Sequence, residues 1–230
     1  MKYIVIGLGN FGSTLATRLT AMGHEVFGVD NSLEKVEQFK DRITHTICLD
    51  SSKPSSLNSL PVKDADQVIM AIGEDVGASI LTTALLKQHN ARSIIGRAIN
   101  PLHQTVLESI GIETIFNPEK IAAEQFAKQL EMNDVVESFD LSEDCSILEI
   151  EVPKRYLGRT AGNIDFKGTY NLKLIGIKRY LTKKNLIGMM SKYATVDMDL
   201  DPEHEFNESD ILVLMGDIKN FQKMIGKDND

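Results

Sequence analysis

The sequence is poor in several features that mark particular classes of protein. It holds two cysteines, Cys48 and Cys145, which lie in different halves of the chain, and this predicts two reduced thiols rather than a disulfide framework. Basic residues are outnumbered, with 25 Lys and Arg against 33 Asp and Glu, for a net charge of −8. An acidic chain of this kind is not expected to have nucleic acid as its main partner.

Other shortages narrow the function further. No apolar run reaches the roughly 18 residues of a membrane helix, and the apolar run at residues 3–6 predicts a core strand rather than a signal peptide. The five histidines show no metal-ligand spacing. The sequence lacks the G-x-x-x-x-G-K-[S/T] loop, which excludes a P-loop ATPase. It also lacks a convincing Ser-His-Asp or Cys-His context for nucleophilic catalysis.

A glycine loop near the start of the chain is the most informative feature present. Residues 3–6 predict a strand, residues 7–12 read G-L-G-N-F-G, and residues 11–22 have the apolar spacing of a helix. Strand, glycine turn and helix are the context in which G-x-G-x-x-G binds dinucleotides. Gly7 allows a sharp turn, Gly9 allows close approach of a pyrophosphate, and Gly12 allows close packing of helix on strand. The free N–H groups that begin the helix favour phosphate.

A second strand, at residues 25–30, ends in Asp30. An acidic residue at this distance from the glycine loop accepts hydrogen bonds from ribose hydroxyls and repels a 2′-phosphate. Asp30 therefore strengthens the prediction of a nucleotide site.

Strand and helix patterns alternate through residues 1–133, which predicts a Rossmann-like parallel sheet with helices on both faces. Further strands are expected at 45–49, 66–72, 93–97 and 113–116, with a short helix at 54–60. In such a sheet, ligands bind at the carboxyl ends of the strands. Residues 118–132 predict a helix that is either a crossover or dimer helix, or an ordinary packing helix.

The pattern changes after residue 133. Residues 134–230 predict a smaller α+β domain, with strands at 135–141, 147–152, 173–178 and 211–215 and a closing helix at 218–225. Residues 178–184 carry four bases and predict a solvated hairpin or, alternatively, a ligand-binding patch. Tyr180 and Lys184 also spell Y-x-x-x-K, the spacing of short-chain dehydrogenases, but they follow a strand rather than lying on a helix beside a nicotinamide. We therefore expect a sensor, not an enzyme.

The order of the motifs resembles the cytosolic regulators of Ktr/Trk potassium uptake systems, built from an RCK (TrkA-N) domain and a TrkA-C domain. The matching residues are G-L-G-N-F-G at 7–12, V-D at 29–30, A-I-G-E-D at 71–75, L-T-T-A-L-L-K at 81–87, R-A at 97–98 and L-E-S-I-G-I-E-T-I-F-N-P-E at 107–119. In the second half they are S-I-L-E-I-E-V-P at 146–153, L-G-R-T at 157–160 and S-D-I-L-V-L-M-G at 209–216.

The resemblance implies a cytoplasmic regulator that lies at the inner face of the membrane through its partner, a potassium-translocating subunit of the KtrB/TrkH type. It implies homodimers that assemble into an octameric ring and bind ATP or ADP, or NAD or NADH, with a divalent cation in some members. Some relatives also bind cyclic di-AMP between their C-terminal domains, whereas residues 184–201 of this chain fit no family pattern.

The resemblance also implies a role for each candidate site residue. The phosphates would lie along Gly7, Gly9, Asn10 and Phe11, and the ribose would be held by Asp30. The adenine would meet Asp50 and Ser51, with Ile72 and Gly73 lining the pocket. Arg97 would face the phosphates, and Glu119 would be the carboxylate near the cation. ATP-responsive relatives often have arginine at the position of Asn10. An amide cannot replace that charge, so ADP, AMP or NAD remain open as ligands.

Two other functions stay open at this point. One is a small NAD-dependent oxidoreductase, in which Tyr180 would act on a carbonyl substrate. The other is a regulator of a different cation channel or exporter, since the same domains recur across cation transport.

Overall fold

The computed structural model describes residues 1–131, 135–184 and 190–226, which divide into two compact units, 1–121 and 122–230. The division falls inside helix α5 (Pro118–Glu131). The boundary predicted between residues 133 and 134 lies outside the described ranges and stays a prediction. Within the described ranges, no helix is long and apolar enough to cross a membrane.

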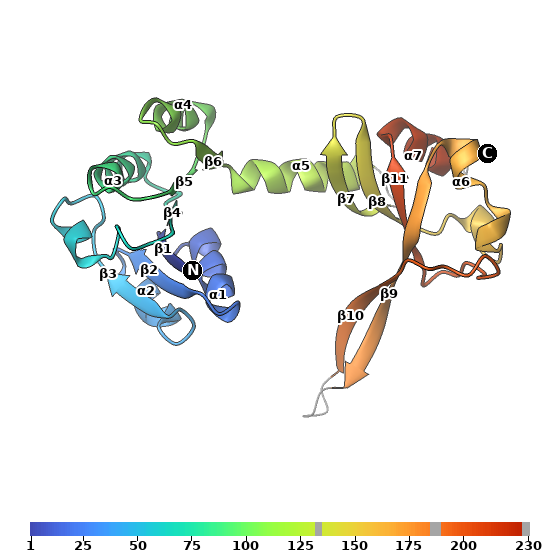
Figure 1. Ribbon diagram of the computed structural model, residues 1–230, viewed down its shortest axis with the longest axis horizontal. Coiled ribbons are helices and arrows are strands. Elements are labelled where there is room, and N and C mark those ends of the chain that lie inside the picture. The colour runs from blue at the N-terminus through green and yellow to red at the C-terminus, as the bar shows by residue number, and fades with distance from the viewer. Residues whose placement is uncertain (132–134, 185–189, 227–230) are drawn as a thin grey trace. The chain divides into compact units, whose positions relative to one another are not determined.

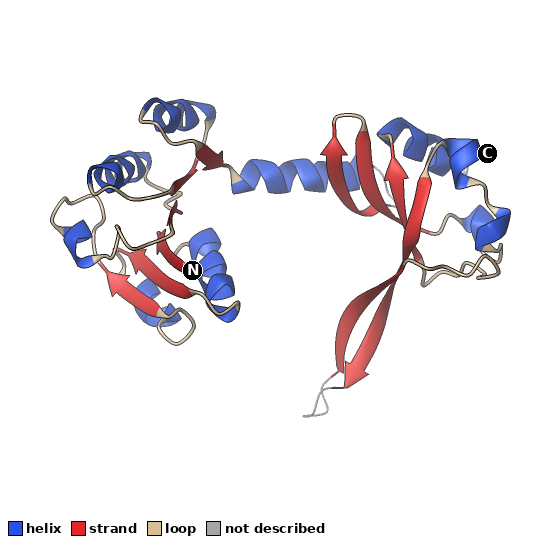
Figure 2. Ribbon diagram, in the orientation of Figure 1, coloured by secondary structure: helices blue, strands red, loops and turns tan. Residues whose placement is uncertain are grey.

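Unit 1 is built on a six-stranded parallel sheet in the order β3-β2-β1-β4-β5-β6 (Figures 1 and 2). Its strands are β1 (Lys2–Ile6), β2 (Glu25–Asp30), β3 (His45–Cys48), β4 (Gln67–Met70), β5 (Ile94–Arg97) and β6 (Thr114–Phe116). The order reverses direction between β1 and β4, as in a Rossmann sheet. The predicted fold class is confirmed in this unit.

Helices cover both faces of that sheet. They are α1 (Asn10–Ala21), α2 (Leu33–Phe39), α3 (Val76–Gln88) and α4 (Pro101–Ser109). Alternate residues of β1 explain the two layers: Val5 packs in one apolar cluster with Ala16 of α1, whereas Ile4 packs in another with Leu86 of α3. Because successive side chains of a strand point to opposite faces, this central strand is buried on both sides.

Unit 2 is an antiparallel five-stranded sheet in the order β10-β9-β11-β8-β7 (Figure 1). Its strands are β7 (Val135–Ser142), β8 (Cys145–Glu151), β9 (Lys173–Lys184), β10 (Met190–Asp197) and β11 (Ile211–Gly216), and its α-helices are α6 (Phe166–Tyr170) and α7 (Ile218–Ile225). Phe206, Phe221 and Met224 belong to its buried core. The predicted smaller α+β domain is therefore present.

Two local predictions were wrong. The helix expected at residues 54–60 is a single 3₁₀ turn, η1 (Ser56–Ser59), in which the Ser59 hydroxyl donates to the Ser56 carbonyl; such side-chain bonds compete with an α-helix. The strand expected to end at residue 178 continues to Lys184 and pairs with β10, so the hairpin predicted at residues 178–184 is present, but its second strand was not predicted. All eight residues of β10 are exposed, so it lacks the apolar alternation that marks a strand.

Candidate functional site

The glycine loop joins β1 to α1 at the carboxyl edge of the unit 1 sheet. Gly7 has a φ of +100°, and a Cβ there would lie 2.8 Å from the Ile72 backbone nitrogen. A Cβ on Gly12 would collide with the Gly7 carbonyl oxygen. Both positions therefore require glycine for the loop to fold.

Gly9 differs from its two neighbours in the motif. It is the N-cap of α1 and makes no side-chain cap, and a Cβ there would meet no atom within 4 Å. The fold therefore does not need glycine at this position. The absence of a Cβ leaves open space at the start of α1. The first N–H groups of this helix have no partners within the helix, and they favour an anion.

Asp30 holds the loop in place from the end of β2. It is 8% exposed, and its Oδ2 accepts from the Leu8 N–H at 2.7 Å while its Oδ1 accepts from the Ser32 N–H at 2.9 Å. Sequence reasoning predicted Asp30 as a ribose ligand but missed this bracing role, because Leu8 is brought beside it only by the pairing of β1 with β2. A carboxylate has about four lone-pair sites, so two bonds leave capacity for a hydroxyl.

Arg97 joins four elements at the same edge. Its Nη1 donates to the Ala71 carbonyl at 3.0 Å, and its Nη2 pairs with Glu119 at the start of α5. The guanidinium carbon lies 5.7 Å from the centre of the Phe11 ring of α1. Its side chain is 13% exposed, so the sheet edge presents a mostly buried cation with one exposed carboxylate beside it.

The two residues after β3 behave differently from each other. The buried Ser51 hydroxyl lies 3.0 Å from the Thr82 Oγ1 of α3. The Asp50 side chain is 40% exposed, and hydrogen bonds from the Ser52 hydroxyl and then from the Ser52 N–H lower the pKa of its carboxyl. Asp50 is thus an anionic acceptor, whereas Ser51 already has a hydroxyl partner inside the unit.

The remaining candidates lie on the same edge. Asn10 is exposed at the first position of α1, and Ile72 and Gly73 follow β4; a Cβ on Gly73 would lie 2.5 Å from the Arg97 Nη1. The structure therefore gathers all eleven candidates at the carboxyl ends of one parallel sheet, the edge at which such sheets bind ligands. Among the described residues, no group of three His, Cys, Asp or Glu side chains could hold a metal ion.

Chemically, this edge combines helix N–H groups, a guanidinium and a buried carboxylate. The first two suit phosphate and the third suits a ribose hydroxyl. Tyr180, by contrast, lies exposed on strand β9 of unit 2 rather than on a helix. The arrangement therefore suits nucleotide binding.

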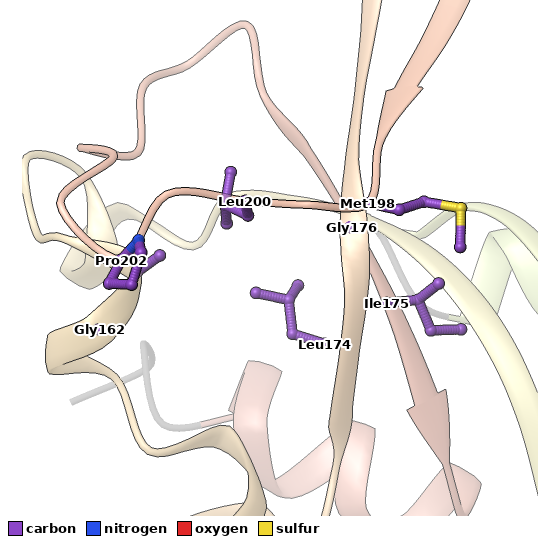
Figure 3. A pocket seen from close by; sticks show the side chains of 8 residues that line it. Gly162, Leu174, Ile175, Gly176, Met198, Leu200 and Pro202 are labelled. Atoms are coloured by element: carbon purple, nitrogen blue, oxygen red, sulfur yellow. The ribbon is translucent and has the colours of Figure 1, made fainter.

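Unit 2 contains a separate hollow of about 270 Å³ (Figure 3). Its lining is entirely apolar or glycine, drawn from β9 and from residues near 162 and 200: Ala161, Gly162, Leu174, Ile175, Gly176, Met198, Leu200 and Pro202. These residues supply no charge for the phosphates of a cyclic dinucleotide. We therefore assign no ligand to this hollow.

Comparison with known proteins identifies the family. Residues 3–118 match the TrkA-N domain. The chain is 34% identical to Ktr system potassium uptake protein C of Bacillus subtilis over 97% of both chains, and 33% identical to protein A of the same system over 96% of this chain and 95% of that one.

Solved structures agree on the fold. The match to the NAD(P)-binding domain of an exopolyphosphatase-related protein from Archaeoglobus fulgidus covers 56% of this chain and 96% of that chain, at 26% identity and a TM-score of 0.51. The match to the RCK domain of the GsuK channel covers 100% of this chain and 47% of that chain, at 15% identity and a TM-score of 0.63. The chain belongs to the TrkA-N family and, within it, to the potassium uptake proteins of the Ktr type.

Proposed function

We propose that the chain is a nucleotide-sensing regulatory subunit that gates a membrane potassium uptake system. The observation that carries the proposal is the match to two Ktr system potassium uptake proteins along nearly the whole of each chain. Both units are included in that match, so the proposal concerns the whole protein rather than its nucleotide-binding half alone.

The ligand proposed for unit 1 is an adenine nucleotide. Its phosphates would lie over Gly9 at the start of α1, its ribose beside Asp30, and its adenine near Asp50 and Ser51. Support comes from the open space at Gly9, the buried carboxylate of Asp30 and the guanidinium of Arg97 at one sheet edge. Asp30 disfavours NADP, because its charge would repel a 2′-phosphate.

Asn10 bears on the number of phosphates. Its side chain is exposed at the helix start and carries no charge, so it offers a terminal phosphate a weaker partner than an arginine would. We therefore favour ADP or NAD over ATP. Glu119 would place a divalent cation near the phosphates, since carboxylates and phosphate oxygens are the ligands that Mg²⁺ prefers.

Gating would work through a difference in affinity. A ligand shifts a conformational equilibrium only if it binds one state more tightly than the other, and moving a population from 1:99 to 99:1 takes about 5.5 kcal/mol. We propose that homodimers, assembled into a ring at the inner face of the membrane, transmit this difference to the potassium-translocating subunit. No catalytic step is needed in this scheme.

Mass spectrometry of the nucleotide released from the purified, heat-denatured chain tests the ligand. An adenine nucleotide at about one per chain is the expected result. Potassium uptake into cells that carry the membrane subunit, with and without this chain, tests the regulation. Uptake that is the same in both cells would contradict the proposal, as would substrate-dependent nicotinamide turnover that is abolished by Tyr180→Phe.

A further inference from the structure

The two-stranded ribbon in unit 2 has no covering element in the described part of the chain. Strand β11 pairs with β9 only from Lys173 to Lys178, so beyond Lys178 strand β9 pairs with β10 alone. The ribbon projects from the rest of the sheet (Figure 1). We call residues 178–184 and 190–196 the basic arm.

The charge of this stretch is opposite to that of the rest of the chain. Residues 178–196 contain five bases and no acid, whereas all 33 acids and the other 20 bases lie elsewhere in the sequence. Two of the five bases are neutralised where the arm joins the sheet: Lys178 pairs with Glu149 and Glu137, and Arg179 pairs with Asp210. Lys183 and Lys192 lie further out, on the exposed part of the arm.

Both faces of the arm mix bases with exposed apolar side chains. Residues directly opposite in an antiparallel pair share a face. Leu181 lies opposite Tyr193, and Lys183 lies two residues along the same face. The other face carries Tyr180 with Lys192. Tyr180 is 53% exposed and Tyr193 is 44% exposed.

An uncovered arm of this composition is poorly stabilised. A two-stranded hairpin on its own is marginally stable in water, and β10 presents a free sheet edge along exposed residues. The exposed aromatic and aliphatic groups gain free energy only when something covers them. The arm therefore has the properties of a docking element.

The acidic surface that complements the arm follows it directly in the sequence. Residues 197–208 contain six acids, every one exposed, and no Lys or Arg; they are Asp197, Asp199, Asp201, Glu203, Glu205 and Glu208. Every copy of the chain thus carries one basic arm and one acidic segment. Two copies related by a two-fold axis can each place an arm on the other's acidic segment, which is the closed, reciprocal contact of an isologous dimer.

We propose that the basic arm docks on a second copy of this chain, against the acidic segment at residues 197–208. The sequence around the arm favours this occupant over an anionic lipid surface, because six exposed acids adjoin the arm and would be repelled by such a surface. The contact involves unit 2 only, and it stands or falls independently of the nucleotide proposed for unit 1.

Complementary variants of the full chain test which copy the arm contacts. One variant keeps its arm and has the six acids of residues 197–208 changed to Asn or Gln; the other keeps the acids and carries Lys183→Gln and Lys192→Gln. The two are co-expressed with different tags, purified through both tags and coupled with a zero-length carbodiimide. Coupling between Lys183 or Lys192 and those acids can then arise only between copies, and it is the expected result.

Hydrogen exchange of the β10 amides provides a second readout. Lys183→Glu with Lys192→Glu should speed their exchange at least tenfold, and adding Asp199→Lys with Glu203→Lys should restore most of the protection. The matched control, Lys219→Glu with Lys223→Glu, makes the same charge change on exposed positions of α7 and should leave β10 unchanged.

Two results would overturn the proposal. The first is β10 exchange that is the same in the Lys183→Glu, Lys192→Glu variant as in the unaltered chain, combined with no coupling between the two co-purified variants. The second is β10 protection that appears only when vesicles rich in phosphatidylglycerol are added, which would assign the arm to lipid instead.

Discussion

The two units differ in whether their clustered polar side chains are open to a ligand or paired with one another. In unit 1 the polar groups gather at one edge of a parallel sheet and leave helix N–H groups and open space at Gly9. In unit 2 a buried carboxylate is fully paired: Asp210 is fully buried and accepts from Arg179 and Asn207. One sheet edge is thus arranged for a ligand, whereas the other sheet holds a closed network.

The closed network of unit 2 lies between β9 and β11. The Asp210 Oδ1 accepts from the Arg179 Nε at 2.5 Å, and the His204 Nε2 lies 2.9 Å from the Asp210 Oδ2. Burial alone would raise the pKa of Asp210, but hydrogen bonds from Arg179 and His204 outweigh it and hold the pKa below 3.8. The carboxylate is therefore ionised at neutral pH and stabilises the fold.

Removing that carboxylate has the largest expected effect. Asp210→Ala leaves Arg179 without its buried partner and should cost unit 2 about 3–5 kcal/mol. Hydrogen exchange of β11 and β8 amides would show the loss while β1 and β4 keep their protection. Glu143→Ala removes an exposed acid of the same unit and should change little. An equal loss in both variants would contradict the network.

Gly12→Ala tests the closeness of packing in unit 1. The added Cβ meets the Gly7 carbonyl oxygen, which cannot move without breaking the loop, so we expect a loss of about 3 kcal/mol. Exchange of the β1 and β4 amides should speed up and that of unit 2 should not. Unchanged exchange in unit 1 would show that the loop can relax.

The third prediction concerns the loss of stability of unit 2 at acid pH when Asp210 becomes protonated. The folded pKa of Asp210 is lowered, so its contribution to stability is present above the unfolded pKa of about 3.8 and is lost as the pH falls through the folded value. The unfolding free energy of unit 2 should therefore decline below about pH 5, with a smaller decline in Asp210→Asn. Equal slopes in the two proteins would assign the acid sensitivity to other groups.

Glu119→Gln should have the smallest effect on stability. The Glu119 side chain is 62% exposed, and glutamine keeps an oxygen that can accept from the mostly buried Arg97 guanidinium, so we expect little change in stability. Thermal unfolding should match that of Glu113→Gln, an exposed control. We expect the substitution to reduce the dependence of nucleotide affinity on Mg²⁺. If it changes the affinity equally with and without Mg²⁺, Glu119 does not belong to the cation site.

The comparison also explains what the sequence could predict. The fold class of unit 1 follows from local signals: a strand, a glycine turn and a helix, then Asp30 at a set distance. Right-handed crossovers limit the strand orders that are possible. The bracing of Leu8 by Asp30 and the pairing of Arg97 with Glu119 depend on which strand ends become neighbours, so no local pattern marks them.

The contacts of unit 2 were harder to predict because they also join residues that are distant in the sequence. Arg179 and Asp210 are 31 residues apart and meet only because β9 pairs with β11. Strand β10 is exposed on both faces, so it gives no periodic signal. The basic run at residues 178–184 predicted a solvated hairpin, but β10, the second strand of that hairpin, was not predicted.

Calorimetric titration of the full chain with ADP, in parallel with its Gly9→Ala variant, tests the central claim most directly. The Ala side chain enters open space in the protein, so the melting temperature should stay within about 1 °C. The same methyl group would occupy the place proposed for the phosphates, so affinity should fall at least tenfold, or about 1.4 kcal/mol. Equal affinity in the two chains, or no binding to the unaltered one, would contradict the assignment of the glycine loop as an ADP receptor.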